Sequence, residues 1–143
     1  MRAVKSSPFR FYNANVETLE YSTRCGGHGF SGISANFYPF LHSWLVKAIA
    51  RADVDQKQID LVQNFFTVAE VVVCINYPAS AKKYLALNYD LPITTKCRKA
   101  EFKFGEQDEL RLNSMAAMCR SVCKQVGIAE IDPVTAKPLP PVE

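Results

Sequence analysis

The fold of this chain is decided by residues 9–34, which read FRFYNANVETLEYSTRCGGHGFSGIS. Phe9–Asn13 is short, aromatic and bounded by polar residues, which is typical of a strand. Glu17–Cys25 is expected to be a helix, and residues 30–34 form a second short run that predicts another strand. Because residues 14–29 leave room for a crossover helix, the two strands are expected to be parallel neighbours in a βαβ unit.

The rest of the chain has the spacing of helices. Four are expected, over residues 41–49, over residues 59–73, from Pro78 to just before Leu91-Pro92, and over residues 107–126. In the last of these, Met115, Met118 and Val122 share one face, and Gly127 stands where a C-cap glycine belongs. The proline-rich tail, residues 131–143, is expected to be disordered.

Composition excludes several classes of function. With 143 residues, 48% hydrophobic and 22% charged, the chain is an ordinary globular domain. A net charge of +3 without a long basic run argues against nucleic acid, and no apolar stretch reaches the length of a membrane span. Five cysteines and no secretory leader favour reduced thiols in the cytoplasm. The spacing of Cys119 and Cys123, with only two histidines in the chain, favours no metal site.

Two parallel strands need neighbours at both edges, so the pattern is that of the end of a larger α/β fold. Residues 25–36, CGGHGFSGISAN, resemble the eighth strand of the dihydrodipicolinate synthase and N-acetylneuraminate lyase family. Residues 11–17, FYNANVE, are similar to that family's seventh strand and its loop. NYPASAKK at 76–83 and LPIT at 91–94 resemble its C-terminal helix and a late turn, so the likeness covers about residues 9–127.

The resemblance implies a fold and an activity. The fold would be α/β, the C-terminal part of a (β/α)8 TIM barrel followed by helices. Residues 1–52 would be the last β/α units, residues 53–130 a C-terminal helical region, and residues 131–143 the disordered tail. The family members are class I aldolases and lyases, which act on pyruvate or another 2-oxo acid through a Schiff base. They use no metal or organic cofactor and assemble as dimers or tetramers.

The Schiff base requires a neutral lysine at the C-terminal end of a barrel strand. Lys5 stands in a Lys-Ser-Ser sequence, but only three residues separate it from the strand that begins at Phe9. A parallel crossover needs a dozen or more residues, so Lys5 is expected to be an exposed lysine rather than the nucleophile. The other lysines fall on expected helices, loops or the tail. The chain is therefore expected to be a C-terminal fragment that is inactive alone. The alternative is a non-catalytic interaction module derived from the family.

A 2-oxo acid would be bound at the C-terminal ends of the two strands. By the resemblance, the candidate substrate-binding residues are Asn13, Ala14, Asn15, Glu17, Ser31, Gly32 and Ile33. Gly32 would allow the backbone to approach the ligand, or it would simply be a small residue that packs inside a tapering barrel.

Glu17 has two interpretations as well. In the sialic-acid lyase branch it would bind a substrate hydroxyl, and otherwise it is a first-turn carboxylate favoured by the helix dipole. Ala14, Val16 and Ile33 replace a glycine, an acidic residue and a serine of that branch, which favours a smaller keto acid over a sugar acid. His28 lies before the second strand, which in a TIM barrel is the N-terminal side. Residues on that side stabilise the barrel, so His28 is expected to have a structural role.

Overall fold

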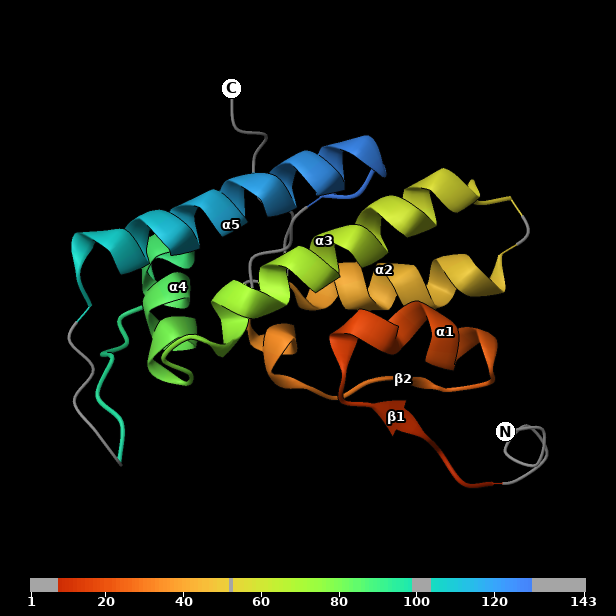
Figure 1. Cartoon of the computed structure of the whole chain (residues 1–143), viewed down its shortest axis with the longest axis horizontal. Coiled ribbons are helices and arrows are strands. Elements are labelled where there is room, and N and C mark those ends of the chain that lie inside the picture. Colours follow the sequence, from red (N-terminus) through yellow and green to blue (C-terminus); the bar gives the residue numbers. More distant parts are fainter. Residues whose placement is uncertain (1–7, 52, 99–103, 130–143) are drawn as a thin grey trace. The chain divides into compact units, whose positions relative to one another are not determined.

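The computed structural model describes residues 8–51, 53–98 and 104–129 (Figure 1). The chain divides into two compact units, Met1–Glu70 and Val71–Glu143. The expectations for Lys5 and for the tail at 131–143 lie outside the described residues. Within the described ranges the fold is mixed α/β, mostly helical, with two strands.

The first unit is built on a parallel pair of short strands. Strand β1 is Tyr12–Asn13 and strand β2 is Gly29–Phe30, with Tyr12 opposite Gly29 and Asn13 opposite Phe30. The pairing extends one residue beyond β2 at each end, because the His28 N–H donates to Phe11 O and the Ser31 N–H to Asn13 O, both at 2.8 Å. The predicted parallel pairing is confirmed, although each strand is shorter than the sequence pattern indicated.

The crossover between the strands is helical, as predicted. It begins with a 3-10 helix, Val16–Thr18, and continues as α1, Leu19–Arg24. The Asn15 side chain starts it, because Asn15 Oδ1 accepts the Glu17 N–H at 2.8 Å. Leu19 is fully buried, and α1 packs against both β2 and the helix that follows.

The expected strand over residues 30–34 is wrong beyond Phe30. Ile33–Asn36 is a 3-10 helix, with extended Gly32 as its N-cap. The Ala35 N–H donates to Gly32 O at 3.2 Å and the Phe37 N–H to Ser34 O at 3.0 Å. Strand β2 therefore ends four residues earlier than the pattern of small residues suggested, and the chain turns into the next helix.

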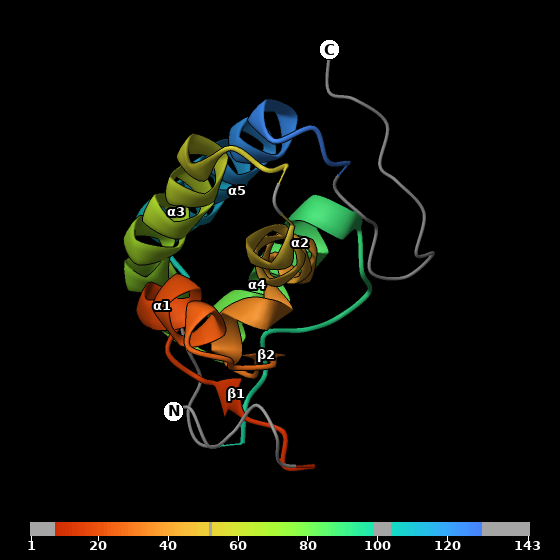
Figure 2. The same ribbon diagram turned by 90° about the vertical axis from the view of Figure 1, so that its right-hand side faces the viewer.

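Two longer helices cover this βαβ unit. Helix α2 is Pro39–Ala50, and helix α3 is Gln56–Cys74, whose residues up to Glu70 belong to the first unit. In both views the strands lie below α1 and α2 (Figure 2). The core uses the apolar stripes that the spacing predicted, with Leu41, Leu45, Val62 and Phe66 fully buried. Trp44 on α2 is half-buried.

The second unit pairs helix α4, Ala79–Tyr89, with helix α5, Glu106–Gln125. Lys83 Nζ lies 2.7 Å from Glu109 Oε1, and Arg120 donates to the Asn88 side chain at 3.4 Å. Both helices were predicted, but Met118 was wrongly placed in the buried stripe, since it is 42% exposed. The buried face of α5 consists of Leu112, Met115, Ala116, Cys119, Val122 and Cys123.

Helix α5 ends as the sequence predicted. Gly127 has φ +70, and the Ile128 N–H reaches back to Cys123 O at 3.0 Å while the Gly127 N–H points to Lys124 O at 3.4 Å. This is the Schellman arrangement, in which glycine adopts the left-handed conformation without strain from a Cβ.

Candidate functional site

The carboxyl ends of β1 and β2 meet at one edge of the sheet, because the strands are parallel. There the backbone of Ser31 is bonded to Asn13 O, and Gly32 lies against the Ala14 carbonyl. The structure thus brings the two predicted groups of site residues together, residues 13–17 at and after the end of β1 and residues 31–33 directly after β2.

Gly32 occupies a crowded position. Its φ is −145, which any residue can adopt, so conformational freedom is not the reason for glycine. A Cβ here would lie 2.4 Å from Cζ of Phe30 and 2.7 Å from the Ala14 carbonyl oxygen. Of the two interpretations of this glycine, close packing therefore suffices to explain it.

The Asn13 side chain makes its hydrogen bonds within the protein. Its amide nitrogen donates to Thr18 Oγ1 at 3.0 Å and to Ser22 Oγ at 2.9 Å, and its oxygen accepts the Asn15 N–H at 2.9 Å. Since both amide hydrogens are used, Asn13 shapes the loop after β1 and has no donor left for a ligand.

Three of the predicted residues keep polar groups toward solvent. Ser31, Asn15 and Glu17 are exposed. Among the contacts of the described residues, the Ser31 hydroxyl, the Asn15 amide nitrogen and the Glu17 carboxylate have no protein partner. Ile33 is half-buried as the first residue of the 3-10 helix. The edge therefore offers a hydroxyl, an amide and a carboxylate to a small polar ligand.

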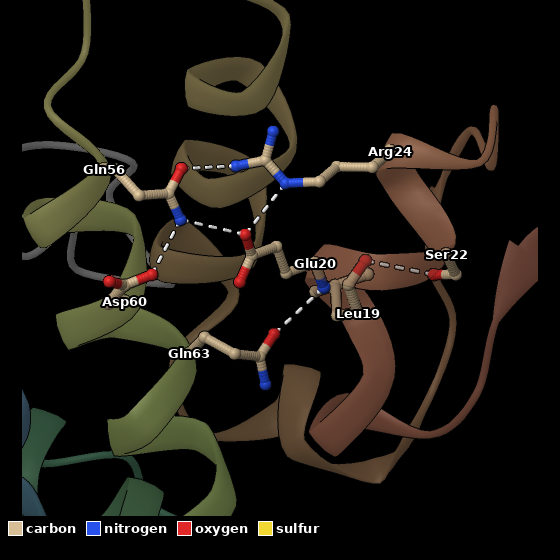
Figure 3. Close-up of polar contacts among 7 residues, drawn as sticks. All are labelled: Leu19, Glu20, Ser22, Arg24, Gln56, Asp60 and Gln63. Carbon is tan, nitrogen blue, oxygen red and sulfur yellow. Dashed lines mark hydrogen bonds and ion pairs between the residues drawn. The ribbon is translucent and has the colours of Figure 1, made fainter.

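A polar network on α3 holds the start of the crossover helix (Figure 3). Gln63 Oε1 accepts the Glu20 N–H at 2.9 Å, and Gln63 Nε2 donates to the carbonyls of Val16 and Glu17 at 3.1 Å. One side chain thus bonds to three backbone groups at the start of the crossover, and the Glu20 N–H is one of those that the first turn of a helix leaves without an intrahelical partner.

The far end of α1 is joined to α3 by hydrogen bonds through Gln56. Arg24 contacts Glu20 at 2.8 Å and Gln56 Oε1 at 2.6 Å, and Gln56 in turn donates to Glu20 and Asp60 (Figure 3). With Gln63, this network fixes the loop that carries Asn15 and Glu17.

His28 pairs with the backbone at the opposite end of the strands. The ring Nδ1 of His28 accepts the Phe11 backbone N–H at 3.1 Å, and the His28 backbone N–H donates to Phe11 O at 2.8 Å. Both interactions extend the parallel pairing, so the side chain acts on the sheet rather than on the carboxyl-end site.

A second histidine, which the sequence analysis did not select, contacts the residues that flank residues 31–33. Ser34 Oγ and His42 Nε2 are 3.1 Å apart, and His42 Nδ1 lies 3.0 Å from Tyr38 O. A carbonyl can only accept, so Nδ1 carries the hydrogen and Nε2 accepts from the Ser34 hydroxyl. Ser34 is 0% exposed and His42 4%.

The His42 imidazole stands between two phenyl rings. Its centroid is 4.4 Å from that of Phe30 and 4.5 Å from that of Phe66, with both pairs near parallel. Burial lowers the pKa of His42 to about 4, although the hydrogen bond to the Tyr38 carbonyl acts in the opposite direction. No sequence motif marks this pair, because an eight-residue separation of serine and histidine has no recognisable pattern.

The lysines of the described ranges lie on helices or loops and not on β1 or β2. Lys47, Lys57 and Lys124 are exposed, Lys83 is paired with Glu109, and the Lys82 ammonium donates to the Lys96 carbonyl. None of these amines, within the part of the chain described, is placed at a strand end as a Schiff base would require.

Other chemistry is sparse in the described part of the chain. No three His, Cys, Asp or Glu side chains gather there into a metal site. The five cysteines, all within those ranges, form no disulfide. None of the described helices is long and apolar enough on its own to cross a membrane, and α3 and α4 meet that criterion only when taken together.

Comparison of the chain with protein-family models, with curated proteins and with solved structures finds no match.

Proposed function

We propose that this chain is the C-terminal portion of a Schiff-base (class I) aldolase or lyase that acts on pyruvate or another 2-oxo acid. In this proposal β1 and β2 are the last two strands of a TIM barrel. The chain supplies one wall of the substrate site and a helical C-terminal region, while the lysine comes from elsewhere in the barrel. The location would be cytoplasmic, and the assembly a homo-oligomer.

One observation carries the proposal. A parallel pair with a helical crossover places residues 13–17 and 31–33 at the carboxyl edge of the sheet, which is where barrel enzymes bind their substrates. The exposed hydroxyl of Ser31 is suited to a ligand carboxylate, and the Asn15 amide nitrogen is a second donor. The Glu17 carboxylate would accept from a substrate hydroxyl.

The test begins with the transcript. Extension at its 5′ end is expected to reveal a reading frame that runs through six further strands, one of which bears a lysine. Treatment of the extended protein with pyruvate and borohydride should then give a stoichiometric adduct on that lysine, detected by mass spectrometry. The 143-residue chain treated in the same way should gain no mass. An adduct on Lys5, or no upstream strands, would contradict the proposal.

A single substitution tests the wall itself. In the extended protein, Ser31→Ala should weaken pyruvate binding by roughly tenfold, since one hydrogen bond to a charged ligand is lost. Ser31 is exposed, so stability should not change. Calorimetry measures the affinity, and Asn64→Ala on the exposed face of α3 serves as the matched control. Equal affinity in Ser31→Ala and the parent would remove Ser31 from the site.

A second function is favoured by the exposed edge of β1. Phe9 is 65% exposed and Tyr12 52%, which is unusual for aromatic side chains beside a strand. Such an edge suits a non-catalytic module that binds another chain. Sedimentation separates the two functions: a stable homo-oligomer of one defined size for the 143-residue chain favours the module, and a dye-binding mixture of species favours the incomplete barrel.

A further inference from the structure

We propose that Ser34 and His42 are a positioning pair that fixes the loop after β2, residues 31–36, and that uptake of a proton by the imidazole releases this loop. The inference goes beyond the proposed function, because it concerns how the loop is held and not what it binds. In the described structure neither side chain hydrogen-bonds to residues 13–17 or 31–33, so the pair acts on the site through the backbone between Phe30 and Ser34.

His42 contacts the loop on both sides of the site residues. Phe30, directly before them, stacks on the imidazole, and Ser34, directly after them, donates to its Nε2. Residues 31–33 are therefore the span between two anchors on one ring. The 3-10 helix itself is held by local bonds, such as Ala35 N–H to Gly32 O at 3.2 Å and the Asn36 side chain to Ile33 O at 3.0 Å.

Protonation must break this arrangement. Nδ1 already donates to the Tyr38 carbonyl, so a proton can only be added at Nε2, the atom that accepts from Ser34. The Ser34 hydroxyl would then have to turn and accept. Its own hydrogen would need a new acceptor at a position with 0% exposure, so the loop must move to supply one.

No charged group contacts the imidazole in the described structure. The segment Gly29–Asn36 contains no charged residue, and the ring contact from α3 is Phe66. Directly before its own helix the titratable neighbour is Tyr38, whose ring centroid lies 5.2 Å from that of the imidazole, and the charged residue on that helix is the exposed Lys47. The charged residues of the packed helices are Glu20 and Arg24 on α1, which bond to each other and to Gln56, and Lys57, Asp60 and Glu70 on α3. The low pKa of His42 thus arises from burial.

Nuclear magnetic resonance of the 143-residue chain tests the pair. In a titration from neutral to acidic pH, the chemical shifts of the His42 ring should change with a midpoint near pH 4. The amide chemical shifts of residues 31–33 should change with the same midpoint. The Gly127 amide in the second unit should not share it. Ser34→Ala should raise the His42 midpoint by about one pH unit, a tenfold gain in proton affinity, because the neutral ring loses a donor.

His42→Gln provides the matched variant, since its side-chain oxygen can accept from Ser34 but cannot titrate. In this variant the amides of residues 31–33 should keep the chemical shifts that they have at neutral pH in the parent chain, and these shifts should no longer change at acidic pH. A His42 midpoint near 6.5, a loop transition that persists in His42→Gln, or a single midpoint shared by every amide would each overturn the proposal. If a variant does not fold, the comparison of the ring and loop midpoints in the parent chain still decides.

Discussion

At the scale of single residues, Gly32 shows how close packing at a strand end dictates the amino acid. Its neighbours are not free to move aside, because Phe30 is stacked against His42 and the Ala14 oxygen belongs to the backbone. A methyl group at Gly32 would therefore press against the stacked rings of Phe30, His42 and Phe66 and would not point into solvent.

Gly32→Ala is expected to lower the free energy of unfolding by about 1–3 kcal/mol, the usual range for overpacking. Urea denaturation followed by circular dichroism measures the change. Ser31→Ala, one residue earlier and exposed, is the control and should stay within about 0.5 kcal/mol of the parent. Equal stability of Gly32→Ala and the parent would mean that the Phe30 ring has room to move.

His42 makes stability depend on pH. Its pKa falls from 6.5 to about 4 on folding, so the unfolded chain binds the proton more tightly. The stabilising contribution is complete above pH 6.5 and is lost as the pH falls toward 4, a change of about 3 kcal/mol. Urea midpoints between these pH values should therefore decline steeply in the parent and less in His42→Gln. Parallel declines in both proteins would contradict the assignment.

At the scale of secondary-structure elements, the sequence was most informative about the helices. Pro78 and Leu91-Pro92 marked the two ends of α4. Three- and four-residue spacing identified α2, α3 and α5, because each of these helices buries an apolar stripe. It erred on Met118, since the buried face of α5 is centred on Cys119 instead. Three apolar residues alone do not define which side of a helix is buried to better than one residue position.

The strands and the site were predicted less completely. Small residues in 30–34 suggested a strand, but backbone bonds from Ala35 and Phe37 close a 3-10 helix there. Parallel pairing implied that both strand ends meet, and they do. Two features of the site depend on tertiary contacts that no local sequence spacing encodes. One is the pair of hydrogen bonds from the Asn13 amide to Thr18 and Ser22, and the other is the Ser34–His42 hydrogen bond.

Gln63 links α3 to the start of α1, and its loss should be costly. Gln63→Ala removes the acceptor of the Glu20 N–H and a donor to the Val16 and Glu17 carbonyls, of which the first still accepts the Leu19 N–H. Unfolding should therefore become easier by about 1–3 kcal/mol. The neighbouring exposed Asn64→Ala should change stability by about 0.5 kcal/mol or less. Thermal or urea unfolding compares the two. Similar stabilities would show that water replaces the Gln63 amide at no cost.

At the scale of the whole molecule, the sheet has only two strands among the described residues, so each strand has an edge without a strand neighbour. The exposed aromatics Phe9 and Tyr12 lie at the β1 side. Unpaired strand edges flanked by aromatic side chains promote association with other chains.

The isolated chain is therefore expected to bind a hydrophobic dye and to sediment as a mixture of species. Replacing both aromatics, as in Phe9→Ser with Tyr12→Thr, should reduce dye binding and shift the chain toward a monomer. Both positions are exposed, so the helical signal should be retained. A sharp monomer without dye binding in the parent chain would contradict the exposed-edge interpretation and, with it, the incomplete barrel.

The position of the single tryptophan gives the protein a built-in optical reporter. Trp44 lies on α2, in the first unit, and it is the only tryptophan in the chain. Its fluorescence therefore follows the unfolding of that unit alone, whereas far-ultraviolet circular dichroism sums the helices of both units. Coincident curves mean that the two units unfold as one cooperative body. Separated curves give each unit its own free energy, without any label or substitution.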